Sequence, residues 1–133
     1  LNPESAEGRL LAMVLSTLQD KVNNNLPLTE RGKWVNLDFI FGIDDEDYII
    51  SIINGKITQI KKRALATESG IFAIRAARST WQEHWRAIPK RDYHDIWSML
   101  PRQLITLDGN LLPLIQNLQF FKDLIASLRE DRD

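Results

Sequence analysis

The segment from residue 34 to residue 76 most constrains the fold, because it has the pattern of short strands joined by tight turns. Apolar and polar side chains alternate over Trp34–Phe41, which predicts a strand with one buried face. A second strand is predicted over Tyr48–Ile53, and the Asn54-Gly55 pair that follows is typical of a two-residue hairpin. Two more strands are predicted beyond this turn, over Lys56–Lys62 and Ile71–Ala76. The short turns indicate that the sheet begins as an antiparallel meander.

Helical patterns flank this segment on both sides. Before it, apolar residues recur at spacings of three and four and predict a helix over about residues 4–23, with Asn2 as cap and Pro3 in its first turn. Residues 26–33 are interpreted as a connection. The change from a period of two to a period of 3.6 after residue 76 predicts that helices follow the strands.

Two short helices are predicted in the region that follows the strands. Ser79 and Gln82 have the spacing of a capping box, with Ser79 as the cap, and Pro89 is expected to end the helix. Asp92 is expected to cap a second helix, which Pro101 ends. Three tryptophans, Trp81, Trp85 and Trp97, lie within seventeen residues of this region. They either fill the core or line a concave apolar pocket, and the residue pattern leaves both interpretations open.

A fifth strand is predicted over Leu104–Leu107, and the Asp108-Gly109 turn leads from it into one long final helix. One row of apolar residues shares a helix face, namely Leu111, Leu114, Ile115, Leu118, Phe121, Ile125 and Leu128. A second row, Leu112, Phe120 and Leu124, lies beside it. Two apolar rows cover more of the helix surface than packing against one flat layer requires. The helix is therefore either surrounded by the rest of the domain, or part of its apolar surface contacts something outside the chain.

The predicted order is α-β-β-β-β-α-α-β-α. Strands grouped before helices predict an α+β layer fold, with a five-stranded, mostly antiparallel sheet. The length of 133 residues fits one domain over residues 1–133, and an apolar content of 44% suffices for a core.

The charge of the whole chain is balanced, with 17 basic and 18 acidic residues, so it gives no argument for nucleic-acid binding. The middle of the chain is locally basic, because residues 56–103 contain ten Lys and Arg against four Asp and Glu. This segment is either a solvated surface or a basic rim that meets an anionic headgroup or an acidic partner. Nucleic-acid binding is not expected, because the aromatic residues are not interleaved with these charges.

The residue types give no positive sign of catalysis. The absence of cysteine excludes disulfides, thiolate metal sites and a cysteine nucleophile, and it fits a cytoplasmic protein. His84 and His94 lack a third metal ligand, and the acidic run Asp44–Asp47 lacks the spacing of a calcium loop. No signal peptide or membrane-spanning run is visible. We therefore expect a protein that is not an enzyme and has no metal or cofactor.

At this point the chain resembles a known family, the sterol carrier protein type 2 domain. The resemblance covers roughly residues 35–121 and suggests a bacterial-type member. It rests on the order of elements together with four pieces of sequence, which are the Asn54-Gly55 hairpin, Phe72–Ala77 before a helix started at Ser79 or Thr80, Leu104–Asn110 and Leu118–Phe121.

The resemblance implies helices over one face of the sheet and an apolar tunnel between the two layers. Such tunnels hold fatty acyl chains, sterols or isoprenoids such as quinones without covalent chemistry. The ligand-binding residues it implies here are Phe72, Ile74, Trp81, Trp85, Ile88, Trp97, Leu100, Leu111, Leu114, Ile115, Leu118 and Phe121. From the basic segment, Arg75, Arg78 and Arg86 are candidates to hold an anionic headgroup.

An alternative interpretation keeps the fold and changes the role. The apolar surface that one contact does not need, on the final helix and around the tryptophans, could be the interface of a structural or dimerising module with a filled core. Such a module could be associated with an enzyme of a lipid or quinone pathway. The expected partner is thus a small hydrophobic ligand, or in the alternative a second copy or an enzyme, with at most transient membrane contact.

Overall fold

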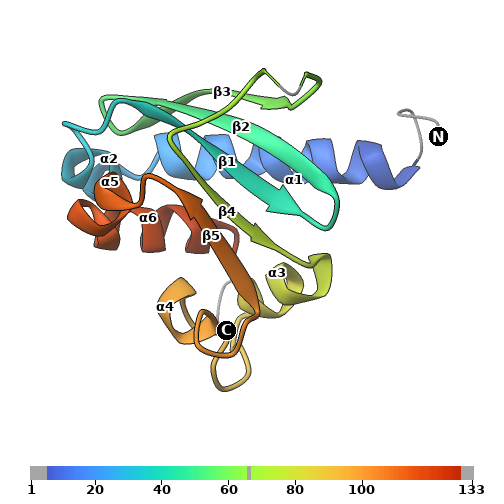
Figure 1. Ribbon diagram of the computed structural model, residues 1–133. Coiled ribbons are helices and arrows are strands. Elements are labelled where there is room, and N and C mark those ends of the chain that lie inside the picture. Colours follow the sequence, from blue (N-terminus) through green and yellow to red (C-terminus); the bar gives the residue numbers. More distant parts are fainter. Residues whose placement is uncertain (1–5, 66, 130–133) are drawn as a thin grey trace.

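A computed structural model describes residues 6–65 and 67–129 and shows one mixed sheet with helices packed against it (Figure 1). The strands are β1 Leu37–Ile43, β2 Glu46–Ile53, β3 Lys56–Lys62, β4 Phe72–Ala76 and β5 Ile105–Gly109. The helices are α1 Ala6–Asn23, α2 Leu26–Arg31, α3 Arg78–His84, α4 Ile96–Met99, α5 Leu112–Gln116 and α6 Leu118–Ile125, followed by the 3-10 turn η1 Ala126–Leu128. The predicted α+β class is confirmed.

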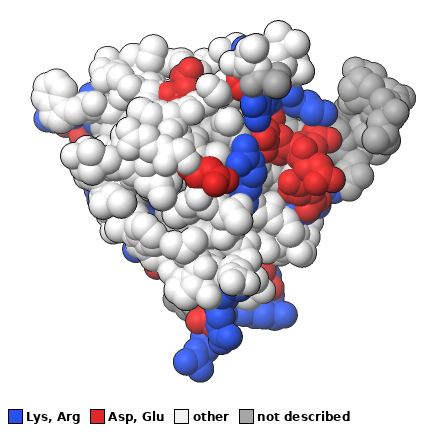
Figure 2. Space-filling view, in the orientation of Figure 1, with Lys and Arg blue, Asp and Glu red and all other residues white. Residues whose placement is uncertain are grey.

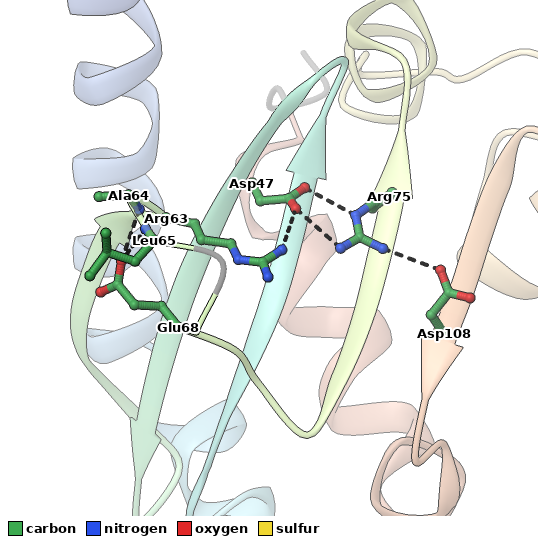
Figure 3. A network of polar contacts seen from close by, with 7 residues as sticks. All are labelled: Asp47, Arg63, Ala64, Leu65, Glu68, Arg75 and Asp108. Atoms are coloured by element: carbon green, nitrogen blue, oxygen red, sulfur yellow. Dashed lines mark hydrogen bonds and ion pairs between the residues drawn. The ribbon is translucent and has the colours of Figure 1, made fainter.

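The sheet has five strands in the order β3-β2-β1-β4-β5. β1, β2 and β3 form the predicted antiparallel meander. β4 then pairs in parallel with β1, and β5 pairs antiparallel with β4. The connection between β3 and β4 crosses β2 and β1 on the face turned away from the helices (Figure 3). At its end, the Ile71 backbone N–H donates to the Asp38 carbonyl at 2.8 Å, which fixes the start of β4 beside β1.

The main core lies between the sheet and the helices. Every second residue of the strands points into it, including Phe39 and Phe41 from β1 and Phe72 and Ile74 from β4. A smaller cluster of Ile40, Ile49 and Ala73 is buried on the opposite face of the sheet. Both faces of the central strand β1 are therefore covered, and its burial extends beyond the simple alternation that the sequence predicts.

The edge strand β3 is held by two side chains of α1, and one of them is Gln19, whose Nε2 donates to the Ile57 carbonyl at 3.2 Å. Asn23, the last residue of α1, donates from Nδ2 to the Ile57 carbonyl at 2.8 Å, and its Oδ1 accepts from the Ile57 N–H at 2.8 Å. This pair of bonds satisfies both backbone groups of Ile57, beside a register shift in the pairing of β2 with β3. The helix thus fixes the edge of the sheet as well as covering it.

The N-terminal prediction is partly wrong. α1 ends at Asn23 as predicted, whereas its predicted start at Asn2 and Pro3 lies outside the described residues. The expected connection over residues 26–33 contains the helix α2, because the Asn25 side chain accepts from the Leu28 N–H at 3.2 Å and caps it. β1 begins at Leu37, so Trp34 precedes the strand, with an exposed fraction of 83%.

The two predicted caps after β4 are also wrong. α3 begins at Arg78, so Ser79 lies inside the helix, and the Arg78 N–H donates to Asp44 Oδ1 at 2.8 Å instead. The cap of α4 is Asp95, whose Oδ1 accepts from the Ser98 N–H at 2.9 Å, and not Asp92. α3 ends at His84, short of the predicted stop at Pro89.

The predicted long final helix is interrupted at Asn117, between α5 and α6. This residue has φ −121° and ψ 37°, which are not helical, and its Nδ2 donates to the Pro113 carbonyl at 3.0 Å. α5 buries Leu114 and exposes Ile115, whereas α6 buries residues of both predicted rows, so the rows are not one continuous buried face. β5 runs from Ile105 to Gly109. It starts one residue later and ends two residues later than the predicted strand.

Candidate functional site

Two tryptophans form the centre of the layer between the sheet and the helices. Trp81 on α3 is fully buried, and its ring centroid lies 4.6 Å from that of Phe41. Trp85, which directly follows the last residue of α3, stacks on Trp81 at 5.9 Å with an interplanar angle of 19°. The Trp81 Nε1–H donates to the Gly42 carbonyl at 2.9 Å, and the Trp85 Nε1–H donates to the Ile125 carbonyl at 2.8 Å. The pair therefore joins β1, α3 and the end of α6, with both indole N–H groups satisfied.

Phenylalanine rings continue this layer toward β4 and α6. Phe39 stacks on Phe72 at 5.3 Å, and Phe121 packs edge-on against both, at 5.5 Å and 5.2 Å. Phe120 lies edge-on to Phe121 at 5.2 Å. These rings and the two indoles make an apolar layer that contains side chains from the strands, α3 and α6. We call it the aromatic layer, defined by Phe39, Phe41, Phe72, Trp81, Trp85, Phe120 and Phe121.

The structure brings together most of the residues that the sequence places in the ligand-binding set. Five are buried in the main core, namely Phe72, Ile74, Trp81, Leu114 and Phe121. Four are partly buried and pack against it, namely Trp85, Leu100, Leu111 and Leu118. Trp97 is half-buried, whereas Ile88 and Ile115 are exposed by 61% and 55%. Ile88 leaves the predicted helix face because α3 ends before it.

Several core residues that belong to the candidate site are absent from the ligand-binding set given by the sequence analysis. Phe39 and Phe41 belong to the aromatic layer, and the alternation of β1 was the signal that could have included them. Phe120 belongs to it as well, although it falls in the second apolar row of the final helix. Met99 on α4 is fully buried. These residues extend the candidate site to β1 and α4.

On the opposite face of the sheet lies a charged network (Figure 3). Arg75 on β4 donates from Nε and Nη2 to the two carboxylate oxygens of Asp47 at 3.0 and 3.1 Å, and from Nη1 to Asp108 at 3.2 Å. Arg63 donates to Asp47 at 3.3 Å. The hydrogen bonds from Arg75 are the main reason that the pKa of Asp47 lies below its usual value. The sheet therefore separates Arg75 from the aromatic layer.

Replacing Asp47 by alanine is expected to lower the free energy of unfolding by about 1 kcal/mol, because two arginines lose a shared, partly buried acceptor. Asp108→Ala is the matched control, since Asp108 contacts the same Arg75 with an exposed fraction of 67%, and less than about 0.5 kcal/mol is expected. Urea denaturation at pH 7 measures both changes. Equal effects of the two variants would contradict a structural role centred on Asp47.

The basic middle segment is matched by acidic side chains. Arg78 approaches Asp44 at 3.7 Å, Arg86 approaches Glu83 at 3.1 Å, and Lys62 approaches Glu46 at 2.9 Å. Lys61 pairs with Glu68 in the same way. On the face of the molecule seen in Figure 2, blue and red side chains accordingly lie next to each other. Part of the positive charge of the segment is thus paired, with acids of the turn between β1 and β2 and of β2 and with Glu68 and Glu83 of the segment itself.

Within residues 6–65 and 67–129, no group of three or more His, Asp or Glu side chains could hold a metal ion. In the same part of the chain, every helix is too short or too polar to cross a bilayer.

Comparison with known proteins defines the class of fold. No family model matches the chain, and no curated protein matches its sequence. A crystal structure of sterol carrier protein 2 superposes with a TM-score of 0.71 at 18% identity, covering 90% of this chain and 96% of that one. The two-layer α+β arrangement is therefore the sterol carrier protein 2 fold.

Two further structures agree over nearly the whole chain. A protein described as "UbiJ-SCP2 Ubiquinone synthesis protein" has a TM-score of 0.61 at 14% identity, covering 97% of this chain and 98% of that one. Sterol Carrier Protein 2 from Yarrowia lipolytica, in its apo form, has a TM-score of 0.58 at 9% identity, covering 98% and 100%. The resemblance inferred from the sequence is thus confirmed at the level of the fold.

Proposed function

We propose that this protein binds a hydrophobic ligand non-covalently and carries it, without catalysing its conversion. The observation that supports this function most directly is the sterol carrier protein 2 fold, which extends over at least 90% of the chain. The aromatic layer supplies the chemistry, because an apolar ligand gains from leaving water for such surroundings. Burying a dozen methylene groups, at about 0.8 kcal/mol each, offers roughly 10 kcal/mol before the costs of ordering.

The proposed site is the aromatic layer and its rim on the helical side. Its candidate lining remains the set implied by the family resemblance, with Phe39, Phe41 and Phe120 added. The exposed positions Ile88 and Ile115 and the half-buried Trp97 would contact a ligand only where it emerges from the layer. The ligand class is a fatty acyl chain, an isoprenoid or quinone, or a sterol, and the names of the similar structures include both a sterol carrier and a ubiquinone synthesis protein.

The side of the sheet on which each candidate arginine lies decides which of them could contact a ligand headgroup. Arg78 begins α3, which also carries Trp81, and Arg86 follows its end, so both stay candidates on the helical side. Arg75 lies on the other face of the sheet, in the network with Asp47 (Figure 3). A ligand in the aromatic layer would therefore reach Arg78 or Arg86 more directly than Arg75.

The alternative function is a structural or dimerising module. It is considered because Trp81 contacts Phe41 and Trp85, so the indoles occupy part of the layer. In that case the half-buried and exposed apolar residues of α5 would form an interface.

Native mass spectrometry of the purified protein, with extraction of any bound lipid, distinguishes the two functions. We expect added mass after incubation with palmitate, a polyprenyl quinone or cholesterol. An unchanged mass with all three, together with a concentration-dependent dimer, would instead establish the module.

A pair of variants locates the ligand. Leu118→Trp adds bulk at a half-buried position against the core and is expected to weaken binding about tenfold, because it fills space that the ligand needs. Ile115→Trp makes a similar addition at a position exposed by 55% and should leave binding unchanged. Thermal unfolding monitored by circular dichroism verifies that both variants fold. Equal affinities in the two variants would place the ligand elsewhere.

A further inference from the structure

The imidazole of His84 is a buried polar group at the edge of the aromatic layer. His84 ends α3, is exposed by 1%, and its ring lies 6.0 Å from that of Trp81 in an edge-on arrangement. Its Nδ1 is 2.8 Å from the Tyr93 carbonyl oxygen. Arg129 Nη2 lies farther from the same nitrogen, at 3.2 Å, and donates to the His94 carbonyl at 2.7 Å. Because a carbonyl oxygen only accepts, the shorter contact with Tyr93 assigns the proton of the neutral ring to Nδ1. Nε2 is then a lone-pair acceptor that points away from Tyr93.

This acceptor is buried, and among the residues that the structure describes it has no hydrogen-bond partner. A buried acceptor without a donor costs about 1–3 kcal/mol. The indole N–H groups of Trp81 and Trp85 donate to backbone carbonyls instead. Arg129 donates from Nε to the His84 carbonyl at 2.9 Å and from Nη2 to the His94 carbonyl at 2.7 Å.

Protonation does not remove this cost at neutral pH. Burial, with the guanidinium of Arg129 next to the ring, lowers the pKa of His84 to about 4, although the hydrogen bond to the Tyr93 carbonyl and the carboxylate of Asp95 act in the opposite direction. Nε2 therefore stays an acceptor. Only a group that donates a hydrogen bond can satisfy it.

The position of His84 connects this acceptor with the proposed ligand. His84 directly precedes Trp85 and lies three residues after Trp81, so it belongs to the same short helix end as the indole pair. A ligand that contacts these indoles from the helical side lies near the imidazole.

We propose that His84 Nε2 accepts a hydrogen bond from a hydroxyl group of the bound lipid. The ligand is then a neutral lipid alcohol, with its hydroxyl on an alkyl chain, a sterol ring or a prenylated phenol. Alkanes, esters and ionised fatty acids offer no donor to Nε2 and bind less well. This inference rests on the proposed lipid-binding function and names the polar group that such a ligand carries.

Paired probes that differ only in the donor test the inference. The affinities of 1-hexadecanol and hexadecyl methyl ether are measured by quenching of tryptophan fluorescence. The wild-type protein should bind the alcohol about 5- to 10-fold more tightly, the ratio that one additional hydrogen bond provides. His84→Phe should bind both probes equally, whereas the matched control His94→Phe, at an exposed histidine, should keep the preference.

A measurement on the wild-type protein does not depend on the folding of a variant. The ¹⁵N resonance of His84 Nε2 should shift when the alcohol is added and should not shift with the ether. The same comparison with cholesterol and a farnesylphenol shows which kind of hydroxyl fits.

The outcomes separate this inference from the function on which it rests. Equal affinity of the wild-type protein for alcohol and ether, or an unchanged Nε2 resonance with bound alcohol, would overturn the role of His84 alone. Failure of every lipid to bind would overturn the proposed function, and this inference with it.

Discussion

Replacing Trp81 by alanine is expected to lower the free energy of unfolding by about 3–5 kcal/mol, a large part of the stability of a domain of this size. The side chain is fully buried, so its removal leaves a cavity between β1 and α3. The change also deprives the Gly42 carbonyl of the indole N–H that donates to it at 2.9 Å. Urea denaturation at pH 7, followed by circular dichroism, measures the loss.

Two other tryptophan variants calibrate this result. Trp34→Ala removes a side chain that is exposed by 83% and whose ring centroid lies 5.6 Å from the Lys33 ammonium, so a loss of less than about 1 kcal/mol is expected. Trp81→Phe keeps most of the volume and loses the hydrogen bond, so its effect should lie between the two. Equal stability of Trp81→Ala and Trp34→Ala would show that the aromatic layer is not the core.

The strands could be predicted because their signals are local. The alternation in β1 and the Asn54-Gly55 turn depend on neighbouring residues, and the structure places a hairpin there with Asn54 and Gly55 at φ 53° and 80°. A Cβ on Gly55 would lie 2.6 Å from the Thr29 carbonyl oxygen, so the turn also needs glycine for space. Local sequence therefore determined the three-stranded meander.

The parallel pairing of β4 with β1 could not be read from local patterns. It depends on a connection that crosses two strands and on the bond between Ile71 and Asp38, which are far apart in the sequence. The role of Arg75 depends on the same pairing, because its two acidic partners come from β2 and β5. Sequence reasoning found the basic segment and missed the acids that neutralise it.

The helix ends were mispredicted for a related reason. Ser79 had a suitable local spacing, yet the first N–H of α3 is bound by Asp44, from the turn between β1 and β2. The short α3 and the interruption at Asn117 then place Ile88 and Ile115 at the surface. Apolar spacing was enough to predict most of the candidate site residues. How far each side chain is buried depends on where its helix ends, which the spacing did not show.

The two interpretations of the tryptophans could be separated only by contacts. Residue types allow an indole to fill a core or to line a pocket, and the hydrogen bonds to Gly42 and Ile125 show that Trp81 and Trp85 are fixed parts of the layer. His84 had no signal in the sequence, because its surroundings come from Tyr93 and Arg129.

The pH dependence of stability provides a second test with a large expected effect. The pKa of His84 is lowered to about 4 in the folded protein, mainly by burial, against about 6.5 in an unfolded chain. The unfolded state therefore binds more protons between these two values, so the folded state loses stability as the pH falls through this window. From pH 7 to pH 5 the free energy of unfolding should fall by about 2 kcal/mol. This window isolates the histidine, because carboxylates titrate mainly below pH 5.

The groups around His84 set the size of this effect. Arg129 and His94 disfavour the charged ring, and Asp95 favours it, so Asp95→Asn should lower the pKa of His84 further. Urea denaturation at pH 7 and at pH 5 measures the change. His84→Phe should remove the dependence in this window, because nothing titrates at that position, whereas His94→Phe should retain it. A wild-type stability that is equal at the two pH values would show that His84 becomes protonated in the folded protein, and Nε2 could then no longer act as a fixed acceptor.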